Sequence, residues 1–287
     1  MTTSAFEYYA PSTVADAIGL LEDHGDSAKL LAGGHSLVPI MKLRLAEPEV
    51  LIDLGQIEAL SGVTDSGDGL SIGPMTTYNQ LMTSELVCSK VAVLAEAAGL
   101  VADVQVRNRG TIGGSISHAD PAGDMPGVVV ALGAEFEATS SSGTRTIAAD
   151  DMFVDLLTTA LNANEILTDI RIKAIPAGTG AAYEKIANKA SRYAIVGVCA
   201  VVSVEDGVCT AARVGVTGTG PKAVRAGASE SALVGSALSA DSIRGAASVA
   251  ADDIDPLSDV HASGDYRIHL TRVAAERAIS KAVSRAG

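Results

Sequence analysis

Tryptophan is absent from the 287-residue sequence, and aromatic residues make up only 3% of it. Ala, Val, Leu and Ile must therefore supply most of the core in a composition that is 47% apolar, which is typical of a packed globular protein. Only three cysteines are present, at Cys88, Cys199 and Cys209. They are too few and too far apart for a disulfide framework or an iron–sulfur site.

Positive charge is also scarce, with 21 basic against 34 acidic residues and a formal net charge of -13. Such an acidic surface repels phosphate backbones and anionic lipids, which argues against nucleic-acid or membrane binding as the main activity. Residues 1–11 lack the apolar segment of a secretory signal, and no apolar run approaches the length of a membrane-spanning helix. These absences predict a soluble, reduced, cytoplasmic protein.

The first part of the chain alternates between helix and strand patterns. Thr13 with Asp16, and Thr77 with Gln80, have the spacing of helix-capping pairs. A third helix start is expected at Asp120, with Pro121 as the first helical residue. Strands are predicted at residues 29–32, 50–54, 70–73, 135–138, 144–147 and 165–172, and a further helix at residues 91–100.

The pattern changes after residues 176–180. This segment is rich in proline and glycine, which interrupt helices and strands, and it is the best candidate for a linker. Residues 194–204 and 210–217 are predicted to pair as strands around a turn at Asp206-Gly207. The remainder is alanine-rich and predicted to be helical, ending with one apolar face made of Leu270, Val273, Ala274, Ala278 and Ala282. The sequence therefore predicts two domains, residues 1–176 and 177–287.

Two glycine pairs, Gly33-Gly34 and Gly113-Gly114, each follow an apolar segment and precede a hydroxyl residue. Glycine allows positive φ and removes side chains, so successive backbone N–H groups can form a nest that binds phosphate oxygens. Two nests suit a ligand with two linked phosphates. The alternative is that both pairs form tight turns, which fits the same residues.

The usual dinucleotide-binding fingerprint is missing, because no Gly-x-Gly-x-x-Gly follows a predicted strand. The glycines of residues 215–220 have the reverse spacing, and Pro221 favours the end of a strand there. No set of residues has the pattern of a nucleophile with its base, and the histidines have no metal-binding spacing. The sequence therefore predicts neither catalytic residues nor a metal site.

The two loops and their flanks resemble those of the FAD-binding medium subunits of the molybdenum hydroxylase (xanthine oxidase) family, and most closely its carbon monoxide dehydrogenase branch. The matching residues are Ala32-Gly33-Gly34-His35-Ser36-Leu37 with Pro39 and Lys42, and Thr111-Ile112-Gly113-Gly114-Ser115 with Asp120-Pro121 and Asp124-Met125-Pro126. The resemblance covers essentially the whole chain.

This resemblance implies an α+β protein with a two-subdomain FAD-binding fold of the vanillyl-alcohol-oxidase/PCMH type, the subdomains spanning about residues 1–58 and 59–176. An α+β C-terminal domain, residues 177–287, would close over a non-covalently bound flavin. The molybdenum cofactor and [2Fe-2S] clusters would belong to a large and a small partner subunit, in a dimer of heterotrimers. FAD would receive electrons from the iron–sulfur subunit and pass them to an external acceptor.

The resemblance favours carbon monoxide as the substrate of such a complex. A nicotine, purine or N-heterocycle hydroxylase is the alternative within the family. Two further alternatives lie outside that role. One is a self-sufficient flavin oxidoreductase, and the other is a phosphate-binding or assembly module without flavin.

The resemblance also assigns cofactor contacts to individual residues, which are Ala32, Gly33, Gly34, His35, Ser36, Thr111, Ile112, Gly113, Gly114, Ser115, Asp124, Leu167, Lys185 and Tyr193. Asp124 would contact the ribityl chain or a nearby part of FAD, and Leu167 would contact the flavin ring through its backbone. Lys185 would lie near the ring and Tyr193 would shield one of its faces. Residue types alone leave alternatives to a cofactor contact open. Asp124 also fits an acidic residue in the first turn of a helix, and Lys185 also fits a solvent-exposed residue at a strand edge.

Overall fold

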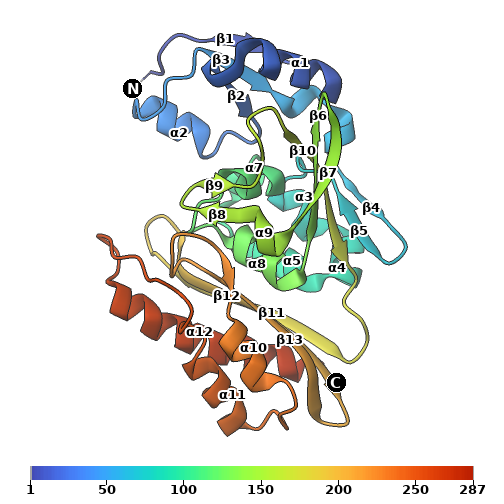
Figure 1. Ribbon diagram of the computed structural model, residues 1–287, viewed down its shortest axis with the longest axis vertical. Coiled ribbons are helices and arrows are strands. Elements are labelled where there is room, and N and C mark those ends of the chain that lie inside the picture. Colours follow the sequence, from blue (N-terminus) through green and yellow to red (C-terminus); the bar gives the residue numbers. More distant parts are fainter. Residues whose placement is uncertain (1, 287) are drawn as a thin grey trace.

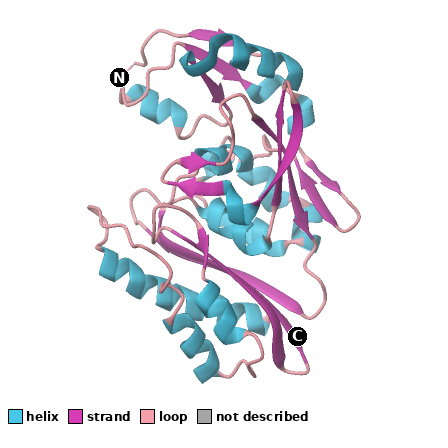
Figure 2. Ribbon diagram, viewed as in Figure 1, coloured by secondary structure: helices cyan, strands magenta, loops and turns pink. Residues whose placement is uncertain are grey.

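The computed structural model describes residues 2–286, and Figure 1 shows three layers of elements following one another from the N-terminal to the C-terminal end. Each layer contains its own sheet. Figure 2 shows that the helices of the middle layer lie between its sheet and the C-terminal sheet.

The N-terminal layer is a small parallel sheet of order β1-β3-β2. Its elements are β1 (Glu7–Tyr9), α1 (Val14–His24), β2 (Ala28–Leu31), α2 (Leu37–Lys42) and β3 (Val50–Asp53). Thr13 caps α1 by accepting a hydrogen bond from the Asp16 N–H. The apolar face of α1, including Ala17, Ile18 and Leu21, is buried in one cluster with Val50 and Ile52 of β3. Strand β2 pairs with β3 from Ala28 to Leu31, and it leads directly into the first glycine loop.

The middle layer has an antiparallel sheet of order β4-β5-β10-β6-β7. The strands are β4 (Val63–Asp65), β5 (Gly69–Ile72), β6 (Glu135–Ser140), β7 (Gly143–Ala148) and β10 (Ile166–Lys173), so the last strand in sequence lies at the centre. The helices are α3 (Tyr78–Thr83), α4 (Glu85–Lys90), α5 (Ala92–Leu100), α6 (Val104–Arg107), α7 (Ile112–His118), α8 (Asp124–Leu132) and α9 (Ala149–Met152). A short hairpin, β8 (Phe153–Asp155) and β9 (Thr158–Thr159), precedes β10.

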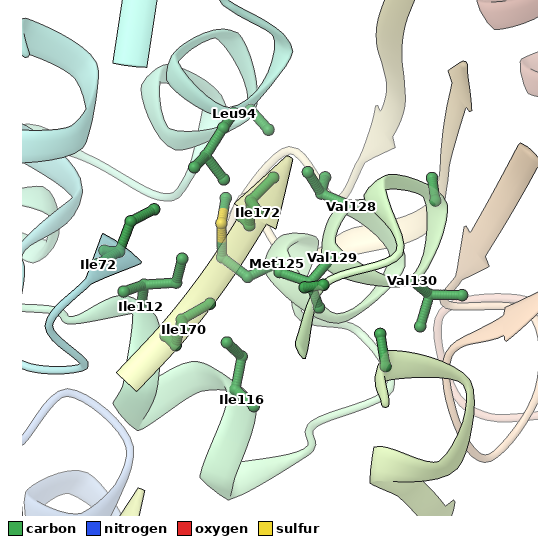
Figure 3. Close-up of a cluster of buried hydrophobic side chains, with 14 of the residues drawn as sticks. Ile72, Leu94, Ile112, Ile116, Met125, Val128, Val129, Val130, Ile170 and Ile172 are labelled. Carbon is green, nitrogen blue, oxygen red and sulfur yellow. The ribbon is translucent and has the colours of Figure 1, made fainter. Parts of the chain in front are cut away.

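The core of this layer lies between β5, β10 and the helices α5, α7 and α8. Figure 3 shows Ile72, Ile170 and Ile172 of the sheet facing Ile112 and Ile116 of α7 and Met125 of α8. Residues 124–131 of α8 are all buried, as expected for a helix that is covered on every side. Helix α8 is therefore a rigid base for the residue at its N-terminus, Asp124.

The C-terminal layer is an antiparallel sheet of order β11-β12-β13-β14. It contains β11 (Thr179–Ala187), β12 (Ala194–Glu205), β13 (Val208–Thr217) and β14 (Val224–Arg225), followed by α10 (Gly227–Leu233), α11 (Ala240–Ser248) and α12 (Gly264–Ser284). Helices pack on both faces of the sheet, with α12 on β11 and β12, and α8 on β12 and β13. Gly215 allows the approach of α8, because a β-carbon there would overlap the Gly127 carbonyl oxygen.

Most predicted elements are confirmed, with ends that differ by one or two residues. The caps at Thr13 and Thr77, the turn at Asp206-Gly207 and the end of β13 before Gly218 are among them. The predicted apolar face of α12 is also found, although Val273 is only half buried. Among residues 2–286, no helix combines the length and the apolar character that crossing a membrane requires.

The helix start predicted at Asp120 and Pro121 is wrong, because α8 begins at Asp124 after Gly123. The Asp120 carboxylate accepts the Ala122 N–H at 2.9 Å, which forms a local turn instead of a helix cap. The predicted linker is also shorter than expected, since Thr179 and Gly180 already belong to β11.

Candidate functional site

A cavity of about 650 Å³ is lined by both glycine loops and by Tyr193, which lies in the loop between β11 and β12. Its volume is within the range of small-molecule and cofactor sites. It brings together most of the residues predicted to contact a cofactor, which are Ala32, Gly33, Gly34, His35, Ser36, Thr111, Gly113, Gly114, Ser115, Asp124, Leu167 and Tyr193. The two predicted residues that do not line it are Ile112, which is buried in the core, and Lys185.

The first glycine loop joins β2 to α2 and offers free backbone donors to the cavity. The N–H groups of residues 33–37 have no hydrogen-bond acceptor among residues 2–286. Gly34 has a φ of 73°, a conformation that favours glycine. The His35 ring nitrogen Nδ1 lies 2.8 Å from the Gly33 carbonyl oxygen, so this side chain folds back onto its own loop. The loop is therefore a nest with the donors that an anion requires.

The second glycine loop is different, and the prediction of a second open nest is wrong. The N–H groups of Ile112 and Gly113 donate to the carbonyls of Thr76 and Pro74 at 3.1 and 2.8 Å. The Gly114 N–H donates to the Thr111 hydroxyl at 3.1 Å, which makes Thr111 the N-cap of α7. Because these donors already have protein acceptors, this loop contributes shape and the Ser115 side chain rather than a row of free N–H groups.

Close packing explains why the second loop needs glycine. A β-carbon on Gly113 would overlap Pro74, and one on Gly114 would lie 2.8 Å from the Thr111 hydroxyl oxygen and 3.4 Å from the Ala32 β-carbon. On the first loop, a β-carbon on Gly33 would overlap the carbonyl oxygen of Arg109. The two loops therefore pack directly against each other and form one continuous wall of the cavity.

Asp124 places a buried carboxylate in the cavity wall. It is the first residue of α8, and its exposed fraction is 5%. Its Oδ1 accepts the Tyr183 hydroxyl at 2.6 Å and its Oδ2 accepts the Lys185 ammonium at 2.8 Å. Burial raises the pKa of the Asp124 carboxyl, whereas the Lys185 charge and both hydrogen bonds oppose that rise.

Lys185 is held behind Asp124 instead of lying free at a strand edge. Its side chain is 4% exposed, and its ammonium also donates to the Leu100 carbonyl at 3.0 Å. Leu100 is the last residue of α5, where helix carbonyls lack partners and carry partial negative charge. Lys185 therefore links the C-terminal sheet to the ends of two helices of the middle layer.

The C-terminal sheet also fixes the segment that leads to Asp124. The Thr217 hydroxyl lies 2.7 and 2.8 Å from the carbonyl oxygens of Pro121 and Gly123, which share its one proton as acceptors. The Ala194 N–H donates to the Ala122 carbonyl at 3.1 Å. Residues 121–123 are thus held by β12 and β13, so the third layer shapes the cavity wall.

Leu167 and Tyr193 line the cavity from two different layers. Leu167 lies at the start of β10, next to a bulge in its pairing with β6. Tyr193 is 43% exposed, and the pKa of its hydroxyl is raised by burial and by the negative charge of Asp120. An aromatic ring that is partly exposed at the edge of a cavity is placed to cover a flat ligand.

Sequence reasoning missed several residues of the cavity wall. Tyr78 of α3 lies beside Ser115, and its ring packs so closely on Gly110 that a β-carbon there would be 2.8 Å away. The segment of residues 157–163 also contributes, held by Glu165, which accepts the Asn162 N–H at 2.7 Å and pairs with Arg145. No local motif marks these residues, although the Thr77 cap indicated the helix that carries Tyr78.

Comparison with known proteins gives matches over almost the whole chain. Residues 4–175 match the family described as the FAD binding domain in molybdopterin dehydrogenase, and residues 181–282 match the CO dehydrogenase flavoprotein C-terminal domain. The carbon monoxide dehydrogenase medium chain of Hydrogenophaga pseudoflava is 41% identical, with 99% of each chain covered. The nicotine 6-hydroxylase medium subunit of Paenarthrobacter nicotinovorans is 38% identical, with 99% of this chain and 100% of the relative covered.

Solved structures agree with the sequence relatives. The carbon monoxide dehydrogenase of H. pseudoflava contains a chain that matches with a TM-score of 0.97 at 42% identity, with 99% of each chain covered. Quinoline 2-oxidoreductase of Pseudomonas putida 86 matches with a TM-score of 0.93 at 34% identity, again covering 99% of each chain. These matches confirm the predicted fold class, and they confirm FAD as the cofactor. The chain therefore belongs to the family of FAD-binding medium subunits of the molybdenum hydroxylases, the flavoprotein subunits of multi-subunit oxidoreductases.

Proposed function

We propose that this chain is the electron-transfer subunit of a molybdenum hydroxylase, taking electrons from an iron–sulfur partner and passing them to an external acceptor. The observation that carries the proposal is a cavity that is lined by a donor nest and by a partly exposed aromatic side chain, in a chain of this family. Among residues 2–286, no group of three or more His, Cys, Asp or Glu side chains is placed to hold a metal ion. We therefore assign the molybdenum cofactor and the [2Fe-2S] clusters to a large and a small partner subunit.

The donors of the cavity fit FAD. The free N–H groups of residues 33–37 suit the pyrophosphate, which an acidic protein must bind through local dipoles and not through net charge. Ser36 and Ser115 add hydroxyl groups to the lining of the same cavity. Asp124 offers a carboxylate that suits the hydroxyls of the ribityl chain.

The ring of the flavin would then lie beside Leu167 and Tyr193. Leu167 offers its backbone there, and Tyr193 would cover one face and exclude water from it. Lys185 lies outside the cavity lining, so we propose that it acts on the cofactor through Asp124. When bound, FAD accepts electrons singly and releases them singly or in pairs, which suits the last step of an electron relay.

We further propose that the complex oxidises carbon monoxide, is a dimer of heterotrimers and lies in the cytoplasm. Two relatives named carbon monoxide dehydrogenase medium chain, at 41% and 39% identity over essentially the full chain, support this substrate. Relatives at 37% and 38% identity are named for 6-hydroxypseudooxynicotine and nicotine, so N-heterocyclic compounds are the second class of substrate to test.

The test is to purify the chain with its partners and add carbon monoxide without oxygen while recording the flavin absorbance. We expect the flavin band to bleach in the complex and to remain unchanged in the isolated chain. Bleaching by nicotine or quinoline, with none by carbon monoxide, would overturn the proposal that carbon monoxide is the substrate, and it would leave the proposed electron-transfer role intact. Oxidation of any of these compounds by the isolated chain would contradict the electron-transfer role itself.

A further inference from the structure

Two side chains of β11 point at the same carboxylate of the cavity wall. Tyr183 and Lys185 are two residues apart and therefore lie on one face of the strand. Their polar atoms bind the two different oxygens of Asp124, at 2.6 Å from the Tyr183 hydroxyl and 2.8 Å from the Lys185 ammonium. Asp124 is thus fixed from behind by the C-terminal sheet, while it lines the cavity in front.

The fold leaves a specific space for the Tyr183 hydroxyl. A β-carbon on Gly197 of the neighbouring strand β12 would overlap that hydroxyl and would also lie 2.9 Å from the methyl group of Thr217. Glycine within a strand costs conformational entropy and loses side-chain packing. Tyr183 itself is 1% exposed, so its hydroxyl has no access to bulk water and depends on Asp124 as its partner.

Both oxygens of the Asp124 carboxylate retain hydrogen-bonding capacity after these two bonds. Each carboxylate oxygen has two lone pairs, of which Tyr183 and Lys185 occupy one each, and the backbone N–H of Asp124 itself also bonds the carboxylate. The remaining lone pairs can accept hydroxyl groups of a ligand in the cavity, provided that the carboxylate stays ionised and does not rotate. Lys185 supplies the compensating charge, and Tyr183 supplies the second point of attachment that prevents rotation.

We infer that Tyr183 is a positioning residue for the cofactor, which orients the Asp124 carboxylate toward the hydroxyl groups of FAD. This role rests on the proposed contact between Asp124 and FAD. Tyr183 does not line the cavity, so it acts through Asp124 and not by touching the ligand. No sequence motif indicated it, because its function depends on a contact with a residue 59 positions away.

The inference predicts a pH-dependent effect. The ionisable groups around Asp124 are Tyr183 and Lys185 from β11, Tyr78 from α3 and Tyr193 from the loop before β12. Burial raises the pKa of the Asp124 carboxyl, and the Lys185 charge and the Tyr183 hydrogen bond oppose that rise. Without that hydroxyl, Asp124 takes up a proton at higher pH, and a protonated carboxyl accepts ligand hydroxyls poorly.

The experiment measures FAD binding to the full chain by the change in flavin fluorescence, at about pH 6 and about pH 8. Tyr183→Phe removes the hydroxyl and keeps the ring. We expect its dissociation constant for FAD to rise about tenfold at the lower pH and clearly less at the higher pH. Tyr266→Phe is the matched control, because Tyr266 is exposed on α12, and it should bind FAD like the wild type at both pH values.

Two further variants separate positioning from folding. Gly197→Ala displaces the same hydroxyl without removing it. It should weaken FAD binding as Tyr183→Phe does, more at the lower pH than at the higher pH. In an Asp124→Asn background, Tyr183→Phe should add no pH-dependent loss, since the titrating carboxyl is gone. The inference is overturned if circular dichroism shows that the Tyr183→Phe chain is folded and its FAD binding is weakened equally at both pH values, or not at all. A wild-type complex that binds no FAD overturns the proposed function instead.

Discussion

Gly33 of the first loop lies against the backbone carbonyl of Arg109, which directly precedes the second loop, with no room for a β-carbon between them. Their contact joins two segments that are distant in the sequence into one wall of the cavity. Of the glycines in the two pairs, only Gly34 has a positive φ. Glycine therefore serves mainly for close approach here, while phosphate binding depends on the free N–H groups of residues 33–37.

Gly33→Ala tests this contact. The new methyl group meets backbone atoms that cannot rotate away, so we expect a loss of about 1–3 kcal/mol in the free energy of unfolding, together with loss of FAD. Gly19→Ala is the control, because Gly19 lies in α1 with nothing within 4 Å of the added carbon. It should stabilise the chain by about 0.5–1 kcal/mol in denaturant unfolding. Equal free energies of unfolding and equal FAD contents for Gly33→Ala and Gly19→Ala would contradict the close packing of the two loops.

Gly114→Val should release FAD by separating the two loops. Its β-carbon would lie 2.8 Å from the Thr111 hydroxyl, which caps α7, and 3.4 Å from Ala32. The bulkier side chain therefore disrupts the cap and moves the first loop, although the Gly114 N–H itself is not free. Flavin content after purification measures the effect. Full flavin content in this variant would show that the second loop does not shape the site.

Lys185→Met should destabilise the protein strongly, because it leaves the Asp124 carboxylate buried without its cation. Removing one partner of a buried ion pair typically costs about 3–5 kcal/mol. Asp124→Asn in the same chain removes the unpaired charge and should restore part of the stability. Thermal unfolding of the single and double variants measures this coupling. Equal melting temperatures for the wild type and Lys185→Met would contradict a buried pair that holds the layers together.

If Lys185→Met retains FAD, the reduction potential of the bound flavin should also change. The Lys185 charge stabilises the ionised form of Asp124, so its removal alters the charge next to the cofactor. A potentiometric titration of the variant against the wild type gives the measurement. An unchanged potential would remove Lys185 from the residues that act on FAD.

Glu165→Gln should lower stability in a pH-dependent way. Hydrogen bonds from Arg145 and from the Asn162 N–H lower the pKa of Glu165 to about 2, from an ordinary value of 4.5. A carboxylate with a lowered folded-state pKa contributes stability above its unfolded pKa, and this contribution is lost as the pH falls toward the folded value. We therefore expect Glu165→Gln to melt below the wild type at neutral pH, with a difference that shrinks between about pH 4.5 and about pH 2.

Glu205→Gln serves as the control for this experiment, since Glu205 is exposed at the end of β12 and forms no ion pair among residues 2–286. Its melting temperature should follow the wild type across the same range. A Glu165→Gln difference that stays constant with pH would show that the loop of residues 157–163 is not held by this ionised side chain.

Local chemistry explains what could be predicted from the sequence. The caps at Thr13 and Thr77 act within one helical turn, and the hairpin at Asp206-Gly207 depends on two adjacent residues with positive φ. The first glycine loop can be predicted for the same reason, because its strand, its glycines and its hydroxyl residue are contiguous. The helix start expected at Asp120 is wrong because an aspartate that accepts a nearby N–H has the same sequence pattern in a turn as at a helix start.

Contacts between distant segments explain what could not be predicted. The sequence alone does not show that N–H groups of the second loop have hydrogen-bond acceptors, because the acceptors, Pro74 and Thr76, lie in another segment. The partners of Lys185 and Tyr183 likewise become evident only when β11 packs on α8. The space beside Gly197 has no sequence signal at all. Such features follow from tertiary packing, which local propensity does not determine.

The most direct test of this account is the identity and amount of the cofactor held by the chain. The chain would be purified with whatever accompanies it, denatured to release its small molecules, and the released flavin identified by chromatography and quantified against protein. We predict FAD, released without cleavage of a covalent bond, at about one per chain. An intact complex that contains this chain and yields no FAD would contradict the account.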